Sequence, residues 1–150
     1  LKGIDIFVSA AAVSDYSSEK VDEHKIKKND EKMSLCLTKS PDILSSVTSL
    51  RSHPFSVGFA AETDNIEVYA KEKLIKKELD MIIANKVGSN LGFDSDENSV
   101  LVLWKGGSKR YKKQLKISLA KQLVQLISKR YMTSSEINKK PSNVSSIYQS

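Results

Sequence analysis

The 150-residue sequence has little of several residue types, and each shortage excludes a class of protein. It contains a single cysteine, Cys36, so an intrachain disulfide cannot form, and a reducing compartment fits this composition. No apolar run approaches the length of a membrane span, and the N-terminus lacks the basic and apolar segments of a signal peptide. We therefore expect a cytoplasmic protein that has no membrane partner.

Chemical motifs are also scarce. The sequence has no Walker loop, no GxGxxG fingerprint and no nucleophile elbow. The two histidines, His24 and His53, lack ligand spacing to other metal-binding residue types, so no metal site is identifiable. Cys36 lies in an alternating apolar run, where a packed or edge thiol is expected rather than a nucleophile. Serine, cysteine and metal hydrolase chemistry therefore have no support.

Aromatic residues make up only 7% of the chain, and none is interleaved with lysines as a stacking platform for nucleic acid requires. The formal net charge is nevertheless +6, which predicts an anionic partner. Since the signal for nucleic acid is weak, a nucleotide or a phosphorylated metabolite is the partner that we expect.

Short apolar runs alternate with helical patterns in the first half of the chain, which is long enough for one domain with a core. Ser40 is a plausible N-cap for the first helix, with Pro41 at its first position and Asp42 at its positive end. Strands are predicted at residues 4–8 (buried), 32–38, 55–61 (buried) and 80–84 (buried), and a second helix is predicted from the cap at 62–65 to about residue 79. This order is typical of a parallel sheet with crossover helices.

The second half of the chain predicts a different arrangement. Residues 99–104 and 109–113 flank Gly106 and Gly107, which indicates a β-hairpin. Residues 115–131 have the apolar spacing of a terminal amphipathic helix. Residues 132–150 are rich in Ser, Asn and Lys, so we expect a disordered tail there.

Four polar or small-residue segments are expected at the carboxyl edge of the sheet, where open α/β sheets bind ligands. Lys73 and Lys77 lie four residues apart, so both ammonium groups share one helix face and would repel each other without an anion such as a triphosphate. The alternative for the two lysines is a solvated helix face neutralised by Glu72 and Glu78. The alternative for the segments after the strands is that they are ordinary charged loops. The four segments are 10–16, 25–28, 58–63 and Asn85.

Six segments in order carry a family resemblance. Together they resemble phosphopantothenate–cysteine ligase of coenzyme A biosynthesis, which in many bacteria is joined to a phosphopantothenoylcysteine decarboxylase in one bifunctional flavoprotein. The resemblance implies that residues 1–131 are the C-terminal part of a ligase domain, without its upstream glycine-rich segment. The segments are AAAVSDY at 10–16, HKIKK at 24–28, KSPDIL at 39–44, VGFAAET at 57–63, LDMIIAN at 79–85 and GFDSDENSVLVLW at 92–104.

The resemblance implies a Rossmann-like three-layer α/β fold with a mostly parallel sheet, and a homodimer or higher homo-oligomer. It also implies a two-step reaction with CTP and Mg²⁺. The carboxylate of 4′-phosphopantothenate attacks the α-phosphate of CTP and releases pyrophosphate, and the amine of L-cysteine then displaces the nucleotide from the acyl-cytidylate. FMN would belong only to a separate decarboxylase domain.

The resemblance also implies a nucleotide site. It gives Lys25 the catalytic role of handling the triphosphate from a loop near the dimer partner. The nucleotide contacts that it implies are Ala11, Asp15, Lys25, Pro41, Asp42, Ile43, Leu44, Phe59, Lys73 and Lys77.

Two other functions are left open by the residues themselves. One is a non-catalytic nucleotide-binding or dimerisation module, which would bind nucleotide without turnover. The other is a dinucleotide-dependent oxidoreductase, suggested by the fold class alone, and the missing glycine-rich fingerprint argues against it.

Overall fold

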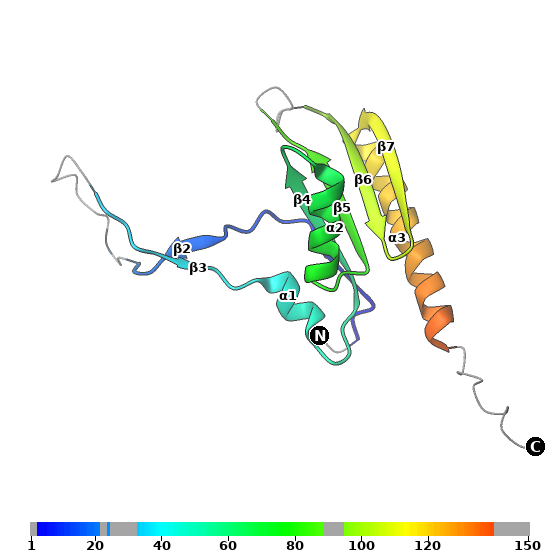
Figure 1. The fold of residues 1–150 in the computed structure, drawn as a ribbon, viewed down its shortest axis with the longest axis horizontal. Helices are drawn as coiled ribbons and strands as arrows, with labels where there is room; N and C mark the ends of the chain where they lie inside the picture. Colours follow the sequence, from blue (N-terminus) through cyan, green and yellow to red (C-terminus); the bar gives the residue numbers. More distant parts are fainter. Residues whose placement is uncertain (1–2, 22–23, 25–32, 89–94, 140–150) are drawn as a thin grey trace, which may run out of the picture.

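The structure is a computed structural model that describes residues 3–21, 24, 33–88 and 95–139. Its centre is a five-stranded sheet in the order β1-β4-β5-β6-β7 (Figure 1). A separate two-stranded sheet pairs β2 with β3. The strands are β1 (Ile6–Ser9), β2 (Tyr16–Ser18), β3 (Leu37–Lys39), β4 (Phe55–Glu62), β5 (Met81–Lys86), β6 (Glu97–Trp104) and β7 (Gly107–Leu115), and the helices are α1 (Ile43–Thr48), α2 (Ile66–Lys76) and α3 (Lys116–Lys139).

The predicted combination of parallel strands and a terminal hairpin is confirmed. Strand β4 pairs in parallel with β1 on one side and with β5 on the other, and β6 and β7 continue the sheet as antiparallel strands. The parallel pairs require crossover connections, which α1 and α2 supply. The hairpin turns at Gly106, whose φ of +85° is a conformation that glycine adopts without steric cost.

Helices cover both faces of the sheet, which makes three layers (Figure 1). On one face, Ala70 and Leu74 of α2 pack with Ile82 of β5 and with the partly buried Leu44 of α1. On the other face, α3 packs over the sheet; its core residues there are Leu119, Leu123 and Ile127, with Leu126 partly buried beside them. The terminal helix therefore packs through an apolar face, as its amphipathic spacing predicts.

Strands β4 and β5 are buried because they lie at the centre of this sandwich. Met81, Ile83 and Val57 are completely enclosed, and Ile82 faces the opposite layer. A strand that is covered on both faces needs a continuous apolar run rather than alternation, and the sequence MIIA from Met81 supplies one.

Strand β1 corrects a prediction. It was expected as a buried strand at residues 4–8, but it spans Ile6–Ser9 and is only half-buried, with Val8 exposed. In the described part of the chain it pairs with β4 alone, so one of its edges and part of its surface remain uncovered.

The helix boundaries correct two further predictions. Helix α1 is capped by Asp42 rather than Ser40, because the Asp42 backbone is extended and its carboxylate accepts the backbone N–H of Ser45. Helix α2 ends at Lys76 instead of continuing to Leu79. Glu78 adopts a left-handed conformation with φ of 51°, and this turns Leu79 back into the core.

The two-stranded sheet forms an arm that extends away from the main sheet (Figure 1). Strand β2 has no counterpart in the prediction. Strand β3 spans Leu37–Lys39, so it shares only residues 37 and 38 with the strand predicted at 32–38 and extends one residue beyond it. Tyr16 pairs with Lys39, and the backbone N–H of Ser40 donates to the Asp15 carbonyl at 2.8 Å. These contacts join the two ends of the arm.

The terminal helix is longer than predicted. It continues past Tyr131 to Lys139, so residues 132–139 are helical where a disordered tail was predicted. Residues 140–150 of that predicted tail lie outside the described residues.

Candidate functional site

The carboxyl ends of β1, β4 and β5 lie at one edge of the sheet, because the three strands are parallel. Ser9 at the end of β1 pairs with Gly58, and β4 then continues to Glu62 beside Asn85 and Lys86. The segment 10–16 therefore leaves the sheet on the side where 58–63 and Asn85 also lie, as predicted. The segment at 25–28, including Lys25, lies outside the described residues.

The base of the arm brings two of the sequence motifs together. The chain leaves β1, passes Ala11 and reaches Asp15, whose carbonyl accepts the Ser40 backbone N–H. Pro41 and Asp42 follow directly, so residues from both motifs lie beside the start of α1. Ala11 and Asp15 are exposed, which leaves both available to a ligand.

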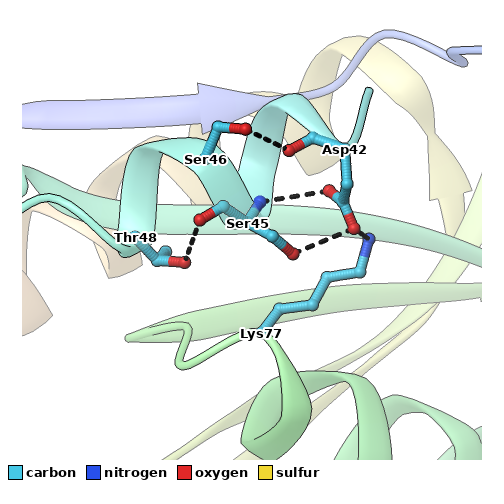
Figure 2. A network of polar contacts seen from close by, with 5 residues as sticks. All are labelled: Asp42, Ser45, Ser46, Thr48 and Lys77. Atoms are coloured by element: carbon cyan, nitrogen blue, oxygen red, sulfur yellow. Dashed lines mark hydrogen bonds and ion pairs between the residues drawn. The ribbon is translucent and has the colours of Figure 1, made fainter. Parts of the chain in front are cut away.

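Asp42 is the centre of the polar contacts at this point (Figure 2). Its Oδ1 accepts the Ser45 backbone N–H at 3.1 Å, and its Oδ2 accepts the Ser45 hydroxyl at 2.9 Å. The Nζ of Lys77 lies 2.9 Å from the same Oδ2. Burial raises the pKa of Asp42, but the Ser45 N–H, the Lys77 ammonium and the Ser45 hydroxyl outweigh it and lower the pKa to about 2. The carboxylate is therefore ionised at neutral pH.

Lys73, one turn before Lys77, makes a second ion pair. Its Nζ lies 2.6 Å from Oε1 of Glu62, the last residue of β4. The two lysines were expected to be neutralised by Glu72 and Glu78 if no anion were bound, but their partners are Glu62 and Asp42. Both carboxylates come from outside α2, so the lysine face is directed toward β4 and α1 rather than toward solvent alone.

Apolar packing fixes α1 against β4. A Cβ atom on Gly58 would lie only 2.9 Å from Leu79 Cδ1 and 3.0 Å from Leu44 Cδ2. The absence of a side chain at Gly58 thus lets Leu44 approach the strand closely. Ile43, its neighbour at the start of α1, is instead exposed.

Phe59 occupies a different face of the sheet from the lysines. Val57 belongs to the core beneath α3, and Ala60 belongs to the core beneath α2. Side chains alternate along a strand, so Phe59 lies on the α3 face, where it is 41% exposed. It is the residue after the Ser9–Gly58 pair, which places it near the end of β1 and the segment that holds Ala11.

Two ammonium groups, each paired with a carboxylate, are what this arrangement offers to a ligand. The ammonium groups are those of Lys73 and Lys77. Residues 11–15 are exposed and mostly small, so a flat ring could approach them. Among the residues that the structure describes, no three His, Cys, Asp or Glu side chains lie close enough to hold a metal ion. The two carboxylates of the site are engaged by lysines.

Glu62 is the site residue that sequence reasoning missed. It was interpreted as part of a helix N-terminus, but it lies at the end of β4 and pairs with Lys73 eleven positions later. Helical spacing identifies neighbours three or four residues apart, so it gives no signal for this pair. The pair depends on the crossover of α2 over β4.

Most of the chain is similar to known proteins. Residues 1–131 match the family described as the DNA/pantothenate metabolism flavoprotein C-terminal domain. The chain is 49% identical over 127 residues to the coenzyme A biosynthesis bifunctional protein CoaBC of Haemophilus influenzae. The matched region covers 84% of this chain and 32% of that protein. It is 42% identical over 127 residues to the CoaBC protein of Vibrio vulnificus, with 82% and 32% covered. The chain thus spans about a third of the length of these relatives.

Solved structures show the same fold. The crystal structure of the C-terminal domain of CoaBC superposes with a TM-score of 0.66 at 27% identity, covering 89% of this chain and 57% of that one. The DNA/pantothenate metabolism flavoprotein from Streptococcus pneumoniae superposes with a TM-score of 0.62 at 24% identity, covering 85% and 61%, and this likeness concerns the fold alone. Within the described residues, no helix is both long and apolar enough to cross a membrane.

Proposed function

Because the chain belongs to the family of DNA/pantothenate metabolism flavoprotein C-terminal domains, we propose that it acts as a phosphopantothenate–cysteine ligase in coenzyme A biosynthesis. In the first step, the carboxylate of 4′-phosphopantothenate attacks the α-phosphate of CTP, and the bond to pyrophosphate breaks. In the second step, the amine of L-cysteine attacks the acyl-cytidylate, CMP leaves, and the amide of 4′-phosphopantothenoylcysteine forms.

The residues of the site suit the charge changes of the first step. Negative charge grows on the departing pyrophosphate, and lysine ammonium groups stabilise such charge without a proton relay. We assign this role to Lys73 and Lys77, together with Lys25 as the catalytic lysine. The nucleotide itself would lie along Ala11, Asp15, Phe59 and the segment Pro41, Asp42, Ile43 and Leu44.

One observation carries this proposal. Lys77, near the end of α2, lies 2.9 Å from Asp42, at the start of α1. These residues are 35 positions apart; Asp42 belongs to the segment 39–44 of the resemblance, and Lys77 is one of the nucleotide contacts that the resemblance implies. A basic helix face thereby lies beside the segment proposed to contact the nucleotide, which supports the binding of a triphosphate there.

Magnesium enters this proposal only as the counter-ion of the triphosphate. Mg²⁺ in nucleotide sites is commonly held by one or two carboxylates together with phosphate oxygens. Asp42 and Glu62 are each occupied by a lysine, and they do not form a ready cage for a divalent ion. We therefore assign no step of the reaction to a protein-held metal ion.

A thermal-shift and calorimetric titration with CTP, ATP and NAD, each with magnesium, tests the nucleotide site in this chain. A ligand that binds only the folded state raises the melting temperature, and we expect CTP to give the largest shift. Lys73→Met and Lys77→Met should each weaken CTP binding by about tenfold, as expected for the loss of a charged contact. Lys76→Met removes the same charge from the same helix and serves as the matched control. Equal shifts for all three ligands would contradict the CTP assignment.

Turnover separates a ligase from a module that only binds nucleotide. Residues 3–131 can replace the matching region of the Haemophilus influenzae relative, which restores the rest of the length of that protein. We expect this hybrid to release pyrophosphate from CTP when 4′-phosphopantothenate is supplied, and to form the amide when cysteine is added. Lys25→Ala should slow pyrophosphate release by about a hundredfold. Binding of CTP without release would favour the non-catalytic module.

The proposal includes a homo-oligomeric protein, most simply a dimer. The arm supports this, because Tyr16, Leu35 and Leu37 on or beside it are exposed and a lone two-stranded ribbon is marginally stable in water. A second copy that covers the arm would bury these side chains. Sedimentation analysis of the chain checks this, with a Leu35→Glu, Leu37→Glu variant expected to shift the protein toward monomer.

A further inference from the structure

The two ion pairs of the lysine face differ in how their carboxylates are held. Asp42 accepts the Ser45 backbone N–H and the Ser45 hydroxyl in addition to Lys77 (Figure 2). The Glu62 carboxylate accepts Lys73 alone among the hydrogen bonds and ion pairs of the described residues. Its side chain is only 12% exposed, whereas that of Asp42 is 42% exposed.

The cost of breaking each pair follows from this difference. If Lys77 moves away, the Asp42 carboxylate keeps its two donors from Ser45 and gains access to water. If Lys73 moves away, the Glu62 carboxylate is left largely enclosed without a donor, and an enclosed charge without a partner is costly. The pair of Lys77 is therefore the easier one to open.

We propose that Lys77 leaves Asp42 to bind the phosphates, whereas Lys73 stays paired with Glu62 and binds them from a fixed position. Glu62 is then a positioning residue for Lys73. This inference rests on the proposed function, because it concerns the same anion site. Lys77 thus exchanges Asp42 for the phosphates, whereas Lys73 is held in position by Glu62 before the ligand binds.

The chemistry of the lysine ammonium permits this division. The group carries three N–H donors, and Lys73 is 46% exposed, so donors remain for a phosphate while one contacts Glu62. A flexible lysine side chain loses rotamer freedom when a ligand immobilises it. Glu62 restricts Lys73 before the ligand arrives, which lowers that loss on binding.

Two carboxylate-to-amide substitutions test the proposal through the affinity of the 150-residue chain for CTP and for inorganic tripolyphosphate. Asp42→Asn weakens the pair with Lys77 but keeps the helix cap, since asparagine caps helices as well as aspartate does. We expect it to tighten binding of both ligands by about two- to fivefold, the range of an exposed ion pair that no longer has to open. Glu62→Gln should leave the affinity equal or weaker.

The Asp42→Asn substitution in a Lys77→Met chain separates this explanation from the simple removal of a negative charge. In a Lys77→Met chain there is no pair to open, so Asp42→Asn should give no gain in affinity. If Asp42→Asn and Glu62→Gln tighten binding equally, or if the gain persists in the Lys77→Met chain, repulsion between carboxylates and phosphates explains the result and the proposal is overturned. Circular dichroism of each variant confirms that it is folded.

The two ligands distinguish failure of this inference from failure of the proposed function. Tripolyphosphate binding with the expected pattern, but without preference for CTP over ATP, would overturn the CTP function and support the exchange of Lys77. Preferred CTP binding that Asp42→Asn leaves unchanged would overturn the exchange and support the function. If neither CTP nor tripolyphosphate binds the unsubstituted chain, both are overturned.

Discussion

The Asp80 carboxylate accepts a hydrogen bond from the backbone N–H of Ser56, with Oδ2 2.7 Å from the nitrogen. The backbone N–H of Asp80 in turn donates to the Ser56 carbonyl at 3.1 Å. Ser56 is completely buried near the beginning of β4, and Asp80 immediately precedes β5. This reciprocal contact joins the starts of the two central strands after the chain has crossed over through α2.

Asp80→Ala should therefore destabilise the protein. It leaves the buried N–H of Ser56 without an acceptor, and such a loss costs about 1–3 kcal/mol in the free energy of unfolding. Urea denaturation measures the change. Asp64→Ala, which removes an exposed carboxylate at the loop before α2, is the control and should change stability by less than about 0.5 kcal/mol. Equal stability of the two variants would contradict the importance of the contact.

Asp42 should make stability depend on pH in the acid range. Its pKa is about 2 in the folded chain, below its ordinary value of 3.8, so the unfolded chain binds a proton more readily between these values. Stability from this group is complete above about pH 4 and is lost as the pH falls toward about 2. Because Asp42 is 42% exposed and screened by water, we expect about 1 kcal/mol.

Asp42→Asn should flatten this part of the stability profile, and Asp64→Asn should not. Stability can be measured by urea titration at several pH values between about 2 and 5. A loss on acidification that is the same in the Asp42→Asn chain would show that other carboxylates produce it.

Glu78→Gly should stabilise the protein. Glu78 has φ of 51°, and Leu79 and Glu78 donate backbone hydrogen bonds to Leu74 and Ile75, the pattern with which helices end at a left-handed residue. Glycine adopts this conformation without the clash that costs other residues about 1–2 kcal/mol, although it loses more entropy on folding. We expect a net gain of about 0.5–1 kcal/mol by thermal or urea unfolding.

Glu72→Gly is the matched control for that variant. It makes the same substitution inside α2, where glycine should lower stability by about 1 kcal/mol. Effects of opposite sign would establish that the conformation of Glu78, rather than the loss of a negative charge, determines the result.

Gly58→Ala should destabilise the packing of α1 on β4. The added methyl group would lie 2.9 Å from Leu79 Cδ1 and 3.0 Å from Leu44 Cδ2, so at least one of them must move. Overpacking of this kind costs about 1–3 kcal/mol. Gly88→Ala, where a methyl group meets no atom within 4 Å, should have little effect in the same unfolding assay.

Local patterns were sufficient to predict the parallel strands and the hairpin. The apolar runs at β4 and β5 and the helical spacing between them require a parallel pair, and Gly106 and Gly107 mark the hairpin. The carboxyl edge followed from the same pattern, since parallel strands end together. The placement of 10–16, 58–63 and Asn85 could thus be predicted without knowing any contact, and the segment 25–28 stays a prediction.

Features that depend on two distant segments could not be predicted in this way. Ser40 and Asp42 are both good capping residues, and the choice is made by the arm, because the Ser40 N–H already donates to Asp15. The partners of Lys73 and Lys77 are 11 and 35 residues away, beyond the reach of helical spacing. Strand β2 exists only by pairing with β3, and its three exposed residues carry little apolar signal.

The arm begins and ends beside one hydrogen bond, which the Ser40 backbone N–H donates to the Asp15 carbonyl. This hydrogen bond holds Asp15 and Ser40 together at the two ends of the arm. Doubling the length of such an excursion costs only about 0.6 kcal/mol in closure entropy. The arm can therefore gain or lose residues at little cost in stability, while the hydrogen bond between Asp15 and Ser40 is kept.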